Sequence, residues 1–435
     1  PFFVLVFIDR SPASRATPAR RRQSALSGRD TPIRLFFMRA IGNPYKNRIF
    51  ATLCLRPKRH GKCKISARLM KPTRKQIWTI AYPILISLLM ENMIGLTDTA
   101  FLGRVGEVEL GASALGSVYY LVIFMLGFGF GIGAQILIAR RNGEKAYALI
   151  GPLFQQGLLF LLSLATVMFV ISHTFTPMVL RSLISSDEVY EAAVSYTNWR
   201  VFGFFFAFVA IMFRAFFVGI TNTKTLTLNS IVMVLSNVVL NYVLVFGKLG
   251  LPAMGIAGAA IASSASEMIS MVFFIVYTRL RIDHRKYGLF RFAGFSSKLL
   301  RGMLNVSVWT MIQMFVAIST WFFFFIAVEH LGERPLAVTN IIRSVSGIVF
   351  VIVSSFASTA STLVSNQMGA GQPELVAGTT RRIVGMCYLI VIPLLALFAV
   401  FPELILRIYT DEQSLIDRSV ASLRVMLSSL SEISG

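Results

Sequence analysis

Long apolar segments recur along this chain from Met70 onward, and each is long enough to cross a lipid bilayer as a helix. About 20 apolar residues in a helix span the hydrocarbon core of a membrane. Hydrophobic residues make up 55% of the 435-residue chain and the mean hydropathy is +0.69, which is outside the range of soluble proteins. The sequence therefore predicts an all-α polytopic membrane protein, with a tenth segment beginning near Leu423 after spans at 77–101, 113–139, 150–172, 199–219, 226–247, 256–279, 302–328, 337–364 and 383–404.

Residues 1–69 differ from the rest of the chain. They hold 16 of its 42 Lys and Arg residues but only 2 of its 20 acidic residues, so most of the net charge of +22 belongs to this segment. We interpret it as a basic extension read from upstream of a start at Met70, with an organellar transit peptide as the alternative. Because the charge is explained in this way, no nucleic-acid partner is predicted. Cys54, His60 and Cys63 are too few and too widely spaced to predict a zinc site.

Basic residues in the connections predict the orientation in the bilayer. The connections on one side carry 16 Lys and Arg residues, whereas those on the other side carry 7. Cytoplasmic loops of membrane proteins are enriched in Lys and Arg. The end that begins at Met70 is therefore predicted to be cytoplasmic.

An internal repeat at an offset of 226 residues divides the chain into two lobes. The segment Arg104–Glu107 aligns with His330–Glu333, and Gly143 aligns with Gly369. The offset covers six crossings, so both lobes have the same orientation, as in transporters built from parallel repeats. We predict a six-helix lobe at 70–295 and a second lobe at 296–435. The second lobe is expected to be truncated at the C-terminus, with about three and a half helices.

Two acidic residues lie inside the first span. Glu91 and Asp98 are seven residues apart, so they lie two turns apart on one helix face. An ionised carboxylate in lipid costs a few kcal/mol, so such residues normally face the protein interior or a water-filled cavity. Pro83 removes one backbone hydrogen bond and permits a bend. This helix is predicted to form a hinged, cation-binding wall.

Other polar residues in the spans are candidates for the same site or for ion pairs. Asn237 and Asn241 are one turn apart on the fifth helix, where they either bind a cation or pack against another helix. Ser263 and Glu267 follow small residues on the sixth helix that favour close packing; Ser263 is a cation-site candidate. We predict that Arg200 extends to the membrane surface. Arg214 and Arg343 either pair with Glu91, Asp98 or Glu267 or contact an anionic substrate.

A membrane-embedded enzyme is the alternative from another functional class. Catalysis requires a clustered acid, base or metal set. The four histidines, His60, His173, His284 and His330, all lie outside the predicted spans. No enzymatic activity, cofactor or metal is predicted, apart from a possible Na⁺ at Asp98.

Several motifs together resemble the multidrug and toxic compound extrusion (MATE) family, from Met70 to the end of the chain. They are AYPIL and DTAFLGRVG in the first span, GFGFGIGAQ and ARRNGE in the second, SNVVLNY in the fifth and GIAGAAIAS in the sixth. The resemblance implies twelve helices in two lobes around a cavity that opens alternately to either side. It also implies export of drugs or organic cations by antiport with H⁺ or Na⁺.

The resemblance also assigns roles to individual residues. Asp98 matches the first-helix acid of the family's N-lobe ion site, and Asn237 matches its fifth-helix Asn. Asn241 stands where some branches have a second Asp, which is similar to the bacterial NorM-like branch. Glu91 stands where Gln is common. Val316 and Ala317 occupy the positions at which some members have a seventh-helix Glu.

These inferences predict a secondary transporter in the bacterial inner membrane, without an obligate protein partner. Its expected partners are the lipid bilayer and a small organic, cationic substrate. The alternative within transport is a lipid-linked oligosaccharide flippase of a related fold, which would need a cationic cavity. Arg214 and Arg343 are the only residues that favour it.

Overall fold

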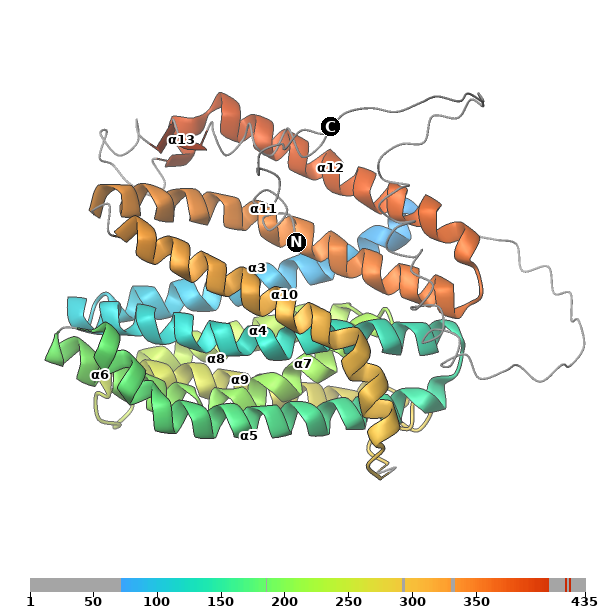
Figure 1. Ribbon diagram of the computed structural model, residues 1–435, viewed down its shortest axis with the longest axis horizontal. Coiled ribbons are helices and arrows are strands. Elements are labelled where there is room, and N and C mark those ends of the chain that lie inside the picture. The colour runs from blue at the N-terminus through green and yellow to red at the C-terminus, as the bar shows by residue number, and fades with distance from the viewer. Residues whose placement is uncertain are drawn as a thin grey trace, which may run out of the picture. The chain divides into compact units, whose positions relative to one another are not determined.

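The computed structural model describes residues 72–184, 186–291, 294–329 and 333–406, together with 419, 420, 422 and 423 (Figure 1). The predicted basic extension and most of the tenth predicted span lie outside these residues. Ten long or medium α-helices follow one another in the described parts, and a short helix follows them. They are α3 (Arg74–Leu102), α4 (Glu107–Gly143), α5 (Ile150–Leu183), α6 (Asp187–Arg200), α7 (Gly203–Gly219), α8 (Lys224–Phe246), α9 (Gly255–Arg281), α10 (Ser297–Glu329), α11 (Glu333–Gly369), α12 (Val376–Val400) and α13 (Pro402–Leu406).

The nine predicted spans are confirmed as helices. Within the described ranges, eight helices are long and apolar enough to cross a membrane, or nine if a bent pair is counted as one span. Most of the helices extend several residues beyond the predicted ends. The protein is an all-α polytopic membrane protein.

The fourth span is not the single straight helix that was predicted. It consists of α6 and α7, which are bent by 46° at a break after Arg200. A helix break leaves backbone carbonyl groups without partners. Two of these, on Trp199 and Arg200, accept hydrogen bonds from the Ser264 hydroxyl of α9 at 3.2 and 3.4 Å.

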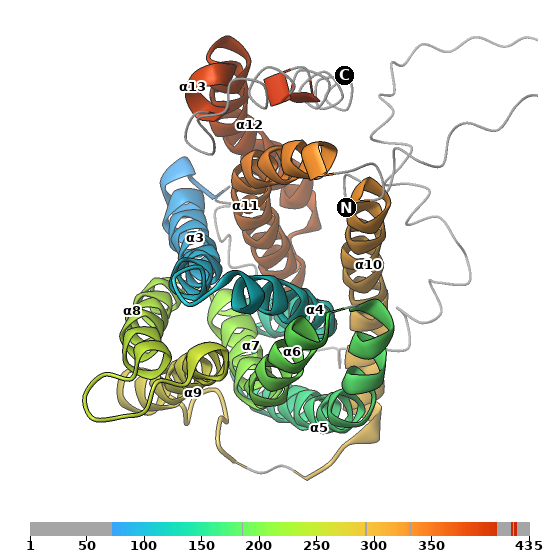
Figure 2. The ribbon, with the colours of Figure 1, turned by 90° about the vertical axis from the view of Figure 1, so that its left-hand side faces the viewer.

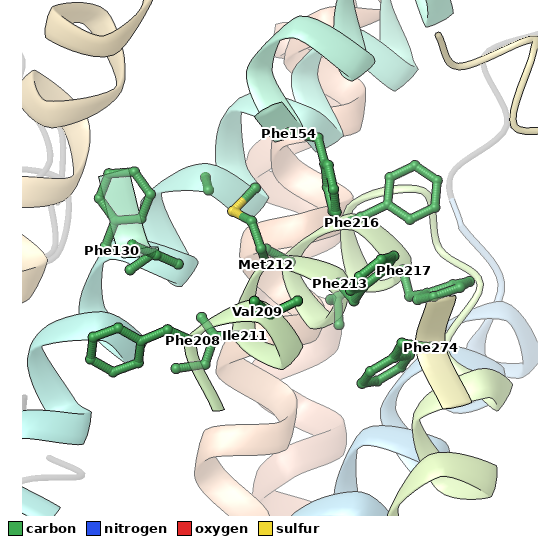
Figure 3. Close-up of a cluster of buried hydrophobic side chains, with 14 of the residues drawn as sticks. Phe130, Phe154, Phe208, Val209, Ile211, Met212, Phe213, Phe216, Phe217 and Phe274 are labelled. Carbon is green, nitrogen blue, oxygen red and sulfur yellow. The ribbon is translucent and has the colours of Figure 1, made fainter. Parts of the chain in front are cut away.

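The core of the first lobe forms around α7. This helix is apolar on all sides, and such a helix is stable only when it is surrounded by others. Nearly all its side chains are buried, and its phenylalanines pack against α4, α5 and α9. Figure 3 shows Phe213 and Phe217 of α7 next to Phe274 of α9, with Phe154 of α5 beside Phe216.

Glycines of α4 admit neighbouring helices on two faces. A Cβ atom on Gly127 would lie 2.5 Å from the ring of Phe208 in α7. A Cβ atom on Gly129 would lie 2.7 Å from the Cα atom of Met311 in α10. Figure 2 shows α4 in this central position, with the first-lobe helices on one side and α10 and α11 on the other. Small residues therefore allow the close helix contacts that join the two lobes.

The second helices of the two lobes, α4 and α11, cross at the ends that carry the basic connections, here called the basic end. A Cβ atom on Gly143 would overlap the backbone of Asn366, and one on Gly369 would overlap the backbone of Arg140. Both pairs of equivalent positions differ by 226 residues. The contact is therefore the same from either side, as expected for repeats related by a twofold axis.

Hydrogen bonds between uncharged side chains accompany this crossing. The Asn142 Nδ2 donates to the Asn366 Oδ1 at 2.7 Å, and the Gln135 Nε2 donates to the Thr362 Oγ1 at 2.8 Å. Amide and hydroxyl pairs satisfy buried polar groups without the desolvation cost of a buried charge. The lobes are joined at the basic end by this uncharged seam.

The connection between α9 and α10 is docked on the first lobe. The Gly151 backbone N–H donates to the Tyr287 carbonyl oxygen at 2.8 Å, and the Gln156 Nε2 donates to the Gly294 carbonyl oxygen at 2.8 Å. Leu289 is buried in the first-lobe core. The described residues of this connection therefore belong to the first lobe as a packed element.

Candidate functional site

Asp98, near the end of α3, receives three hydrogen bonds from two neighbouring helices. Its Oδ1 accepts from the Asn237 Nδ2 at 3.1 Å and from the Asn241 Nδ2 at 2.7 Å, both on α8. Its Oδ2 accepts from the Ser263 Oγ of α9 at 2.6 Å. Four of the predicted site residues are therefore brought together around one carboxylate.

The amides beside Asp98 are fully buried and one of their oxygens has no partner. The Asn237 Oδ1 accepts from the Asn241 Nδ2 at 3.2 Å. The Asn241 Oδ1 is buried without a hydrogen-bond partner. A buried polar atom without a partner costs free energy, so it marks a place where a cation or a proton donor fits. Carboxylate, amide and hydroxyl oxygens are also the ligands that hard cations prefer.

The packing of α3 against α8 positions this site. The two helices run in parallel, so that hydroxyl and amide groups of α8 meet α3 at regular intervals. The Ser87 and Ser230 hydroxyls lie 2.7 Å apart, two to three turns before Asp98. Both helices contact α9, which supplies Ser263.

Pro83 lies within a continuous α3 whose missing hydrogen bond is replaced by α8. Proline has no backbone N–H, so the carbonyl group four residues earlier, on Thr79, loses its donor. The Thr223 Oγ1 donates to that carbonyl at 3.4 Å, and the Thr227 Oγ1 donates to the Pro83 carbonyl at 3.1 Å. Hydroxyl groups of a neighbouring helix often satisfy the backbone at a membrane proline in this way.

Glu91, the other acid of α3, forms an ion pair with Arg214 of α7. The same oxygen, Oε1, accepts from the Ser87 Oγ at 3.3 Å. The sequence left the partner of Arg214 open among three acids, and the structure selects Glu91. The Glu91 side chain is 33% exposed and that of Arg214 is 16% exposed.

Arg200 does not extend to the membrane surface, so this prediction was wrong. Its side chain is 11% exposed and binds both oxygens of Glu267, at 2.6 and 3.0 Å. The guanidinium lies 3.5 Å from the centroid of the Tyr120 ring, and the Tyr120 hydroxyl also donates to Glu267. The break after α6 places Arg200 inside the bundle rather than at its edge. No spacing in the sequence indicated that Tyr120 takes part.

Two further residues lie apart from these groups in the sequence. Arg343 is on α11 of the second lobe, with an exposed side chain. His173 was predicted outside the spans, but it lies inside α5, because this helix continues to Leu183. Its ring stacks on Phe169 with the centroids 5.7 Å apart. Among the described residues, no three His, Cys, Asp or Glu side chains are grouped to hold a metal ion.

Comparison with known proteins extends these observations to most of the chain. The MatE family model matches residues 83–243 and 310–431, two stretches whose starts are close to the repeat offset. The probable multidrug resistance protein NorM of Pasteurella multocida is 24% identical over 357 residues, which cover 81% of this chain and 75% of that protein. The probable multidrug resistance protein YoeA of Bacillus subtilis is 25% identical over 351 residues, 79% of this chain and 76% of that protein.

Solved structures share the fold. A multidrug resistance MATE family transporter in its outward-facing conformation superimposes with a TM-score of 0.73 at 19% identity. The superposition covers 81% of this chain and 78% of that one. A MATE structure in the bent conformation gives a TM-score of 0.72 at 20% identity. Since the family model covers more than half of the residues and both lobes, the chain belongs to the MatE family.

Proposed function

We propose that this protein is a secondary transporter that exports organic cations in exchange for H⁺ or Na⁺. The observation that carries the proposal is the carboxylate of Asp98, which is surrounded by amide and hydroxyl groups and lies next to a buried acceptor without a partner on Asn241. Its relatives NorM and YoeA are named as probable multidrug resistance proteins. Export rather than catalysis is also the activity of the family.

The ion site can take either coupling ion by a small rearrangement. A Na⁺ beside Asp98 would be held by carboxylate and amide oxygens, and the Asn241 Oδ1 would become a ligand. A proton on Asp98 would be donated to a neighbouring oxygen, which the same amide provides after a flip. In both cases, the ion neutralises a charge that is costly to keep in a membrane interior.

Antiport requires that the ion and the substrate favour different states of the protein. A ligand shifts an equilibrium only by its differential affinity for the two states. We propose that the basic end faces the cytoplasm and that the lobes are closed there by the seam between α4 and α11. The Arg382 Nη1 adds a second contact at this end by donating to the Pro72 carbonyl at 2.7 Å. The bacterial inner membrane is the proposed location.

The flippase alternative loses support from Arg214. A cavity for an anionic lipid-linked substrate needs free positive charge, but the charge of Arg214 is balanced by Glu91. We therefore retain only the cation exporter.

The proposal is tested by efflux of ethidium from cells that express the protein with Asp98→Asn. We expect the variant to lose ion-driven efflux, because an amide neither ionises nor binds a cation as strongly as a carboxylate. Asp187→Asn is the matched control, since Asp187 is an exposed acid that pairs with Arg181 at the surface. Ethidium efflux that continues at the native rate in Asp98→Asn would contradict the proposal. Imposed pH or Na⁺ gradients in proteoliposomes then separate the two ions.

A further inference from the structure

The Glu91–Arg214 pair bridges two helices that otherwise barely meet. Within the described residues, α3 packs mainly on α8 and α11, whereas α7 packs on α4, α5 and α9. The long side chain of Arg214 crosses between α7 and α3 to reach the Oε1 of Glu91. A charged pair in a membrane segment faces the protein interior or a water-filled cavity. The exposed third of Glu91 therefore faces a space inside the bundle that is accessible to small molecules.

The contacts of this pair are incomplete compared with those of Arg200 and Glu267. Both oxygens of Glu267 bind both Arg200 and Tyr120, and its side chain is 15% exposed. The recorded hydrogen bonds of Glu91 all go to Oε1. No hydrogen bond to its Oε2 is found within the described ranges. A single-point contact leaves this carboxylate able to accept another positive group.

Arg214 has a second place to rest if it leaves Glu91. Its guanidinium lies 5.7 Å from the centroid of the Phe128 ring on α4. The face of an aromatic ring attracts a cation, and the attraction increases where water is excluded. The guanidinium therefore does not become an isolated charge when the carboxylate is taken by another partner.

We propose that Glu91 binds the positive group of the exported cation, and that Arg214 is the internal counter-ion that holds this carboxylate until the cation replaces it. The inference rests on the proposed function, for which it supplies a substrate contact distinct from the coupling ion at Asp98. Exchange of one cation for another at Glu91 keeps the site neutral in the empty and loaded states. An uncompensated buried charge is avoided in both. Arg214 thereby sets the affinity of the site without touching the bound molecule.

Binding of two probes to the purified protein in lipid nanodiscs tests this arrangement. The probes are ethidium, a permanent cation, and N-phenyl-1-naphthylamine, which is uncharged. We expect Glu91→Gln to raise the Kd of ethidium by about tenfold or more, because the carboxylate is lost. We expect Arg214→Met to lower it by several-fold, because the competing guanidinium is gone. The Kd of the neutral probe should change in neither variant.

The opposite signs distinguish competition from a structural role. If Glu91→Gln and Arg214→Met both weaken ethidium binding, the pair only supports the fold and the inference is wrong. An unchanged ethidium Kd in Glu91→Gln would also overturn it. Arg214→Lys, which keeps the charge at shorter reach, replaces Arg214→Met if the latter does not fold, and the same decrease in Kd is expected. Failure of the native protein to bind ethidium would instead count against the proposed function.

Discussion

The buried pair of Arg200 and Glu267 differs in environment from the surface pair of Arg181 and Asp187. The surface side chains are 56% and 78% exposed, so water screens their attraction. Around the buried pair, Gly203 begins α7 without a side chain, and a Cβ atom there would collide with both charged groups. The glycine thus leaves room for the pair exactly where the fourth span bends. The pair links α6 and α9 to Tyr120 of α4.

Removing one partner of the buried pair should strongly destabilise the protein. We expect Arg200→Met to lower the free energy of unfolding by about 3–5 kcal/mol, because Glu267 would remain buried without a counter-ion. The double variant with Glu267→Gln should recover much of this loss. Thermal unfolding in detergent measures both. Arg181→Met is the control, for which no measurable loss is expected. Equal losses in the single and double variants would show that the charges are not coupled.

The chemical types of the site residues were predictable from the sequence, whereas their partners were not. An acid inside an apolar span is costly, so Asp98 and Glu91 stand out without a structure. The distance between Arg214 and Glu91 depends on how α7 rotates relative to α3. Apolar composition does not determine this rotation, because α7 is hydrophobic on all sides.

At the scale of helices, α8 stabilises the backbone of α3 around its proline. The Thr223 and Thr227 hydroxyls occupy successive turns of α8 and bond to successive turns of α3. Bending of α3 at Pro83 would have to break these bonds or carry α8 with it. The two helices are therefore expected to move together over this region.

Loss of these hydroxyls should loosen α3 near its proline. We expect the double variant Thr223→Val, Thr227→Val to cost about 1 kcal/mol, at roughly 0.6 kcal/mol for each membrane hydrogen bond. Hydrogen exchange of the peptide that contains Pro83 should become faster. Thr166→Val is the matched control, because its hydroxyl bonds only to Leu162 in its own helix. Unchanged exchange in the double variant would show that α8 does not hold the bend.

The sequence located nearly all the helices but missed one break. Hydropathy registers whether a residue is apolar, and the residues on both sides of Val201 are apolar. The bend between α6 and α7 depends instead on tertiary contacts, in particular the bonds of Ser264 to the carbonyls at the break. Such contacts leave no periodic signal in the chain.

At the scale of the whole molecule, the two lobes share a repeat but not a charge. The position 226 residues after Asp98 is Phe324, and the position after Glu91 is Ala317. The acids therefore occur in one lobe only, while the glycines of the seam occur in both. The repeat could be predicted because polar landmarks stay in register. The crossing of Gly143 and Gly369 could not, since an alignment contains no distances.

A cross-link across the seam should stop transport. We expect Asn142→Cys and Asn366→Cys to form a disulfide on mild oxidation, because the native side chains are in contact. Cys54, Cys63 and Cys387 are replaced by Ser in this background. Ethidium efflux should cease and return on reduction. The control pair, Ser117→Cys with Asn366→Cys, places the first cysteine far along α4 and should not cross-link. Efflux from fully cross-linked protein would show that the seam need not open.

The docked connection has a mechanical consequence for α10. Only Phe295 and Ser296 separate Gly294, which is held by Gln156, from the first residue of this helix. So short a joint acts as a fulcrum, and α10 acts as the lever. A helix of 33 residues is about 50 Å long, so a rotation of 10° about the joint would displace its far end by roughly 9 Å. The same rotation barely moves the end at the joint, so a swing about this point widens one side of the molecule much more than the other.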